Sequence, residues 1–123
     1  MNEAILSISP HRHLLELRKH ALENAGFVVI SVNSEVEALF EIRMGQCGVL
    51  VLCHRLHQEV HRSLSSEFRK YCVKGVVVGI MAEEPASPPK HLDLFVRHSE
   101  RAEALVAALL KHPETKKLAS RVA

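Results

Sequence analysis

The chain has 123 residues, with 16 Lys and Arg, 14 Asp and Glu and 9 His, and its formal net charge is +2. This length suits one domain with a single hydrophobic core. The balanced charge argues against nucleic acid or an anionic membrane as the main partner. Only one acidic residue, Asp93, is an aspartate. Chemistry that needs clustered aspartates, such as a hard-metal cage, is therefore nearly excluded.

The sequence carries no sign of a membrane span or a leader. No apolar run approaches the roughly 20 residues of a spanning helix, and the first ten residues lack a basic stretch followed by a long apolar core. The cysteines are Cys47, Cys53 and Cys72, an odd set without CxxC spacing. Such thiols are typically reduced and buried, so we expect a cytoplasmic protein.

The first 26 residues predict a strand and a helix. Residues 4–8 form a short apolar run, which predicts the strand. Ser9 as N-cap and Pro10 as first helical residue predict a helix that ends before Gly26. We expect its inward stripe to be Leu14, Leu17, Ala21, Leu22 and Ala25.

A second strand and helix follow. Residues 27–32 are rich in β-branched residues, which predicts the strand. Ser34 and Glu37 have the spacing of a capping box, and the helix they begin should end near Gly45. We expect its inward residues to be Val36, Leu39, Phe40 and Met44.

The third strand is apolar at every position from 49 to 53, as in a parallel strand buried on both faces. A helix follows, with apolar residues every fourth position at Leu56, Val60, Leu64 and Phe68. Gly75 ends the next turn, and residues 76–81 predict a fourth strand.

The pattern then changes. Residues 82–92 contain three prolines and cannot form a regular helix. Residues 94–96 predict a short fifth strand, Ser99 is the expected N-cap of the last helix, and Pro113 should interrupt it. We expect the inward residues of that helix to be Ala102, Leu105, Val106, Leu109 and Leu110.

Strands that alternate with helices predict an α/β fold with a doubly wound, five-stranded parallel sheet. Right-handed crossovers give the flavodoxin-like order 2-1-3-4-5, with the fourth helix missing or replaced by the proline-rich loop. We expect one domain at residues 1–112 and a tail or helix extension at 113–123. A site should lie at the carboxyl ends of the strands, near the switch between strands 1 and 3.

Four stretches carry a family resemblance: AILSISPHRHLLELRKHALENAGFVV, EVEALFEIRMGQCGVLVLCHRL, VVVGIMAEE and LFVRHSE. Over roughly residues 3–112 the chain resembles the receiver domain of bacterial two-component response regulators, of the chemotaxis-regulator kind. The resemblance implies two acids after strand 1 that hold Mg²⁺ and an aspartate ending strand 3 that accepts a phosphoryl group. It also implies a hydroxyl residue ending strand 4 and a lysine ending strand 5.

This chain departs from that pattern at nearly every position. The acidic pair falls on Ser9 and Pro10, the acceptor on Cys53 and the hydroxyl residue on Met81. Arg97 alone keeps a positive charge, in the place of the lysine. It is either an anion contact left from the family site or a plain strand-end charge. We therefore interpret the chain as a degenerate receiver, or pseudo-receiver, that needs no cofactor and is not an enzyme.

Cys53 has two interpretations. Beside His54 at the switch point it is either an accessible thiolate that senses oxidants or acts as a nucleophile, or a buried residue that completes an apolar strand. A phosphatase-like loop would need arginine six residues beyond the cysteine, and that position is Glu59. The enzyme interpretation fails on this spacing.

The histidines also have two interpretations. His54, His57 and His61 have the spacing H-x2-H-x3-H, so the last two lie one helical turn apart, as transition-metal ligands do. His11 and His98 come from neighbouring strand ends and are further candidates. Alternatively, residues 57 and 61 belong to a solvated helix face, and no metal binds.

The sequence thus favours a stand-alone receiver-like protein that acts in signal transduction by protein–protein contact, independently of phosphorylation. The alternative is a transition-metal or redox sensor built on the histidine and cysteine cluster. Without the fourth helix, the sheet near strands 4 and 5 needs another cover, and we expect the 113–123 tail or a second chain to supply it. We expect a protein partner of unknown identity, with homodimerisation through strand 4, strand 5 and the last helix.

Overall fold

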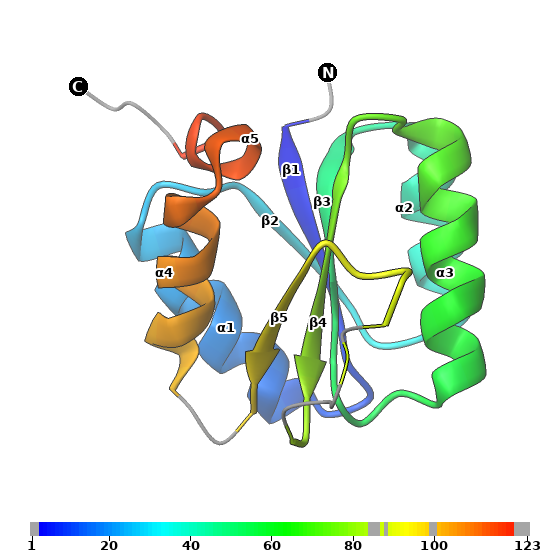
Figure 1. Ribbon diagram of the computed structural model, residues 1–123, viewed down its shortest axis with the longest axis horizontal. Coiled ribbons are helices and arrows are strands. Elements are labelled where there is room, and N and C mark those ends of the chain that lie inside the picture. Colours follow the sequence, from blue (N-terminus) through cyan, green and yellow to red (C-terminus); the bar gives the residue numbers. More distant parts are fainter. Residues whose placement is uncertain (1–2, 84–86, 88, 99–100, 120–123) are drawn as a thin grey trace.

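The computed structural model describes residues 3–83, 87, 89–98 and 101–119. Its five strands form one parallel sheet in the order β2-β1-β3-β4-β5, which confirms the predicted order. The strands are β1 (Ala4–Ile8), β2 (Val29–Val32), β3 (Cys47–Leu52), β4 (Val76–Met81) and β5 (Leu94–Arg97). The helices are α1 (Arg12–Asn24), α2 (Glu35–Met44), α3 (Gln58–Tyr71), α4 (Ala102–Lys111) and α5 (Pro113–Lys116). Helices α1 and α4 cover one face of the sheet, and α2 and α3 cover the other (Figure 1).

The sheet separates two apolar layers because successive side chains of a strand point to opposite faces. Leu6 and Leu50 pack toward α2 and α3. Ile5 and Val49 pack toward α1 and α4. All of β1 and β3 is buried, which explains why β3 lacks polar alternation. Within the described residues, no helix is long and apolar enough to cross a membrane.

Helix α1 begins later than predicted. Its N-cap is His11, whereas the Ser9 hydroxyl accepts a hydrogen bond from the His11 backbone N–H at 3.0 Å and forms a turn before the helix. Leu22 of the predicted stripe is buried as expected, but the rest of the buried face is shifted by one position. The buried face comprises Leu15, Arg18 and Leu22, while Leu17 is 49% exposed.

Helix α2 is capped as predicted but faces the other way. The Glu37 N–H donates to the Ser34 hydroxyl at 3.2 Å, and Gly45 ends the helix at a left-handed φ of 75°. The predicted inward face was wrong at three of its four positions, which are Val36, Phe40 and Met44, exposed by 78%, 61% and 54%. Ala38 and Ile42 are buried instead. Apolar residues stand on every side of this helix, so its pattern selects no single face.

The connection between β4 and β5 has no helix among its described residues, 82–83, 87 and 89–93. Leu92 of this loop packs directly over Gly79 of β4, where a Cβ atom would lie 2.5 Å from the Leu92 Cδ1 atom. Leu92 also contacts the α2–α3 layer, and the loop swings toward α3 (Figure 1). The loop therefore provides the cover that we expected from the tail or a second chain.

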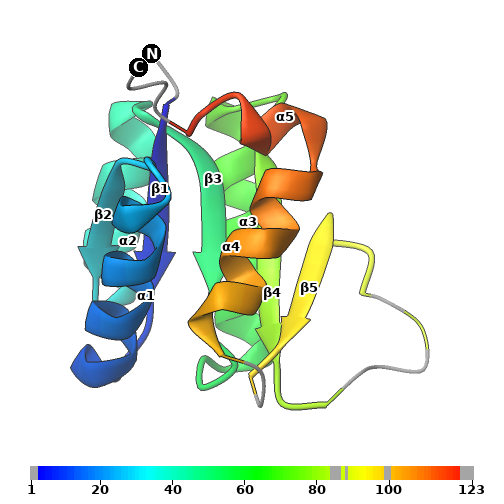
Figure 2. The ribbon, with the colours of Figure 1, turned by 90° about the vertical axis from the view of Figure 1, so that its left-hand side faces the viewer.

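The tail lies elsewhere. Pro113 begins α5, and Leu118 and Ala119 pack against the opposite layer, beside α1 and α4. The Thr115 hydroxyl donates to the Leu109 carbonyl oxygen and fixes α5 to the end of α4. Figure 2 shows α5 at the end of the sheet where β1 begins.

The helix predicted as the last one corresponds to α4, and it agrees in part with that prediction. Ser99, the predicted N-cap, lies outside the described residues, and the N-cap of α4 is Arg101. Leu105 and Leu109 are buried as expected. Leu110 is 36% exposed, so its predicted inward position was wrong.

The sole aspartate fastens β4 to the loop. Its carboxylate oxygen Oδ2 accepts from the Val77 N–H at 2.8 Å and from the Arg69 Nη2 atom at 2.9 Å, and its own N–H donates to the Val77 carbonyl at 2.8 Å. Because β5 begins only at Leu94, the Val77 N–H donates to the Asp93 side chain instead of to a backbone carbonyl of β5. Arg69 links α3 to the same point.

Candidate functional site

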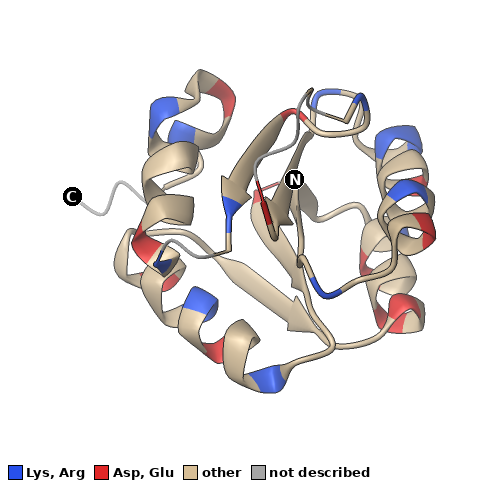
Figure 3. Cartoon of the chain, turned by 60° about the horizontal axis from the view of Figure 1, so that its bottom comes forward, with Lys and Arg blue, Asp and Glu red and all other residues tan. Residues whose placement is uncertain are grey.

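The carboxyl ends of the strands meet at one end of the molecule, which Figure 3 turns toward the viewer. Ser9 and Cys53 lie there after the two central strands, and neither is exposed. The Ser9 N–H donates to the Val32 carbonyl and the Cys53 N–H donates to the Ile8 carbonyl, each at 3.3 Å. Both residues thus continue the sheet pairing instead of opening a pocket.

The two other degenerate positions are less buried. Pro10 is exposed at the turn before α1, and Met81 is half-buried at the end of β4. Neither side chain offers an oxygen atom. With Ser9 and Pro10 at the two positions where the family resemblance implies magnesium-binding acids, neither position carries a carboxylate.

The Cys53 thiol is enclosed by its own chain neighbours. Its Sγ atom lies 3.7 Å from the His54 Nδ1 atom and accepts from the Arg55 N–H at 3.5 Å. Since the residue is fully buried, an oxidant or electrophile cannot reach the sulfur in this conformation. The geometry agrees with the structural interpretation of Cys53 and disfavours the redox one.

His54 and His98 stack across the strand ends, with ring centroids 4.1 Å apart and an interplanar angle of 11°. The contact joins the segment after β3 to the segment after β5. Burial lowers the pKa of His54, and the electrostatic effects of His98, Arg18, Arg55 and His11 add to this shift, which brings the pKa from 6.5 to about 4. His54 is therefore a neutral ring near pH 7.

His11 is also held at the strand ends. The Arg55 Nε atom donates to the His11 Nε2 atom at 3.0 Å, so this ring nitrogen is the acceptor. Arg55 and His11 come from the segments after β3 and β1. Two of the predicted candidates, His11 and His98, thus converge with His54, as expected from the topology.

The predicted set His54, His57 and His61 does not converge. His61 is 4% exposed, contrary to the predicted solvated face, and its Nε2 atom donates to the Cys53 carbonyl at 2.9 Å. Burial lowers its pKa, and the hydrogen bond to Cys53 opposes that shift. His57 is exposed as the N-cap of α3. Within the described part of the chain, no three His, Cys, Asp or Glu residues are placed to hold a metal ion.

His61 is buried because the loop that replaces the fourth helix lies over it. The His61 and His91 rings meet edge to face, with centroids 6.0 Å apart, and burial also lowers the pKa of His91. The apolar stripe of α3 therefore includes a histidine as a packing residue, which a pattern of aliphatic residues alone does not reveal.

Arg18 is the residue of this region that the sequence analysis missed. It is 7% exposed and lies between Leu15 and Leu22 on the buried face of α1. A charged residue at an inward helical spacing is the signal that identifies it. Arg97, by contrast, is exposed and lies at the end of β5, as predicted.

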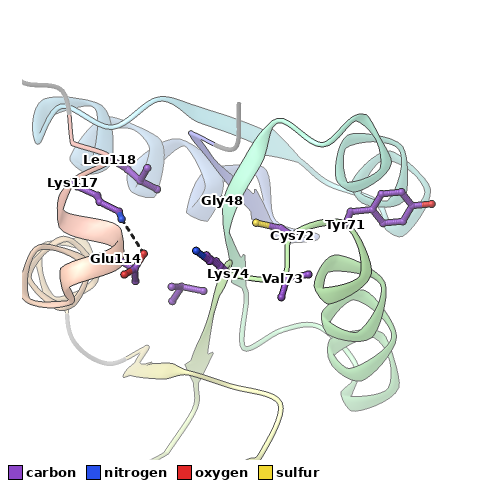
Figure 4. A pocket seen from close by; sticks show the side chains of 9 residues that line it. Gly48, Tyr71, Cys72, Val73, Lys74, Glu114, Lys117 and Leu118 are labelled. Carbon is purple, nitrogen blue, oxygen red and sulfur yellow. Dashed lines mark ion pairs between the residues drawn. The ribbon is translucent and has the colours of Figure 1, made fainter.

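Two further hollows lie away from the strand ends. One, of about 390 Å³, lies at the amino-terminal end of the sheet between α5 and the α3–β4 turn, and its Lys117 and Glu114 side chains pair at 3.1 Å (Figure 4). The other is a groove of about 530 Å³ between β5 and α4, lined mainly by apolar residues such as Phe95 and Ala104.

No family model matches the chain, and no curated protein matches its sequence. Solved structures do match. The chemotaxis response regulator CheY4 of Vibrio cholerae is 13% identical with a TM-score of 0.78, over 90% of this chain and 98% of that one. The signal receiver domain of a putative Luxo repressor protein from Vibrio parahaemolyticus is 14% identical with a TM-score of 0.78, over 96% and 93%. A response regulator from Thermotoga maritima is 18% identical with a TM-score of 0.75, over 90% and 97%. The chain therefore has the CheY-like, flavodoxin-like fold of response-regulator receiver domains.

Proposed function

We propose that this protein is a degenerate receiver that works in signal transduction through protein–protein contact, without transfer of a phosphoryl group to an aspartate. The receiver fold supports the signalling role. The residues at the strand ends support the absence of phosphoryl transfer. The buried thiol of Cys53 occupies the acceptor position, and Ser9 and Pro10 occupy the positions of the magnesium-binding acids.

The electrostatics of the strand ends support the same proposal. Mg²⁺ requires oxygen ligands in octahedral geometry, and phosphoryl transfer relies on such an ion to offset charge. The side chains that gather here are His11, His54, His98, Arg55 and Arg97. A neutral or cationic set of this kind offers a divalent cation no favourable site.

The test is incubation with acetyl phosphate and Mg²⁺, followed by intact-mass measurement. We expect no added phosphoryl mass, while a receiver with intact acids, treated in parallel, gains it. Cys53→Asp alone should remain unmodified because Ser9 and Pro10 supply no carboxylate. Covalent phosphate on the native chain under these conditions contradicts the proposal.

A second copy of the chain is the partner that we propose for the β4, β5 and α4 face. The groove beside β5 is apolar, and β5 is an edge strand of the sheet, which presents unpaired backbone groups for association. Ala107 lines this groove and is exposed. Contact across the groove would bury the apolar side chains of β5 and α4.

Sedimentation equilibrium tests the dimer. Ala107→Glu should shift the native chain from dimer to monomer, because it places a charge in the apolar groove. Phe40→Glu, on the exposed face of α2, is the matched control and should leave the dimer intact. A native chain that stays monomeric at high concentration excludes this assembly.

A further inference from the structure

A small cavity of about 180 Å³ lies between α1, the ends of β4 and β5, and the beginning of α4. Its polar lining residues are Arg18, Arg97, His98 and Arg101, and its other six lining residues are apolar. No acidic residue lines it among the described parts of the chain. The cavity therefore combines positively charged side chains with apolar walls.

Arg18 is the central group of this cavity. Its side chain is 7% exposed, and its buried Nη1 atom has no hydrogen-bond partner. Guanidinium stays protonated in proteins, and an unsatisfied donor on a buried charged group destabilises the folded state. Its charge also contributes to lowering the pKa of His54, after burial and His98. Since the Arg18 side chain lines the cavity, an anion bound there would offset the charge of this guanidinium.

The first turn of α4 adds a second source of positive potential. The helix has ten residues, and its N-cap, Arg101, makes no side-chain cap hydrogen bond. Arg101 and Ala102 both line the cavity. The unpaired N–H groups and the dipole of a helix N-terminus favour an anion at this position.

We propose that this cavity binds one compact phosphate group, either free or as a monoester. Arginine forks match phosphate oxygens, and a dianion offsets more of the assembled charge than a carboxylate does. The volume lies below the roughly 300 Å³ at which pockets for larger organic ligands begin, so a nucleotide does not fit inside. The degenerate acceptor, Cys53, does not line the cavity. The proposal therefore shares Arg97 and His98 with the strand ends but does not depend on the acceptor position.

The experiment is a titration of the full chain with inorganic phosphate and with phenyl phosphate, at constant ionic strength set by chloride. Calorimetry measures the affinity, and thermal melting measures the stabilisation. We expect saturable binding and a rise in Tm that chloride does not produce. Tighter binding of phenyl phosphate identifies a monoester as the ligand class, and tighter binding of inorganic phosphate identifies the free ion.

Arg18→Met is the decisive variant. It should weaken phosphate binding at least tenfold, which is about 1.4 kcal/mol. In phosphate-free buffer it should melt at the same temperature as the native chain or higher, because an unpartnered buried charge is removed. Arg62→Met, an exposed position on α3 across the sheet, is the control and should bind phosphate normally.

Arg101→Gln supplies a second readout if Arg18→Met does not fold. Arg101 is exposed, so the fold should tolerate the change, while phosphate binding weakens several-fold. Native-like phosphate binding in both variants, or stabilisation that chloride reproduces, overturns the proposal. Failure here leaves the acetyl phosphate result unaffected, so the two proposals fail separately.

Discussion

Removal of the Asp93 carboxylate should destabilise the protein more than its exposed position suggests. The Val77 N–H is buried in β4 and donates to this carboxylate at 2.8 Å. In Asp93→Ala it loses that acceptor, which costs about 1–3 kcal/mol for a buried donor. The Arg69 ion pair, with both side chains about one-third exposed, adds only about 0.5 kcal/mol. The expected loss is about 2–3 kcal/mol in the free energy of unfolding.

Asp93→Asn separates these two contributions. The amide oxygen can still accept from Val77, while the charge opposite Arg69 is gone, so we expect a loss of about 0.5–1 kcal/mol. Urea unfolding followed by circular dichroism gives each free energy from the midpoint and slope. The reasoning is refuted if Asp93→Ala stays within about 0.5 kcal/mol of the native chain, or if Asn is as harmful as Ala.

Three further predictions concern pH, the loop cover and α2. Because the pKa of His54 falls from 6.5 to about 4 on folding, the folded state favours the neutral ring; stability should be constant above pH 6.5 and should fall as the pH drops from 6.5 toward 4. The full shift corresponds to at most about 3.4 kcal/mol, and solvent screening at this partly exposed ring reduces the effect to about 1–2 kcal/mol. In His54→Gln, the urea midpoint should depend less on pH than in the native chain, which checks the assignment. Gly79→Ala should lower the free energy of unfolding by about 1–3 kcal/mol, because the added Cβ atom forces Leu92 away. Part of this loss should disappear when Leu92 is also replaced by alanine. If the two losses simply add in this double-mutant cycle, the packing argument is contradicted. Phe40→Ser should change stability by less than about 0.5 kcal/mol, whereas Ile42→Ala should cost about 2–4 kcal/mol; equal losses by thermal melting contradict the assigned face of α2.

The strands and their order could be predicted because local signals determine them. Residues 4–8 are apolar throughout, and Gly45 adopts the left-handed conformation that its position after a helix suggests. Right-handed crossovers then leave one order for the strands. The convergence of His54 and His98 follows from the same order, because both residues come after the carboxyl ends of parallel strands.

The predictions that were wrong concern features that depend on contacts between residues distant in sequence. The face of α2 is ambiguous because apolar residues surround it, and only packing against the sheet selects Ala38 and Ile42. His61 is buried because the β4–β5 loop places His91 against it. Leu92 covers Gly79 because that glycine leaves room for a side chain from a loop without a regular pattern.

The placement of the two chain ends has a practical consequence. Ala4 begins β1, and Ala119 follows α5, which lies at the same end of the sheet (Figure 2). His54 and His98 follow the opposite, carboxyl ends of β3 and β5. A parallel strand of six residues, such as β3, spans about 20 Å. A label attached near Ala4 or near Ala119 therefore lies about one strand length from the cavity lined by Arg18. Immobilised or labelled protein can thus present this cavity to ligands in solution without obstruction.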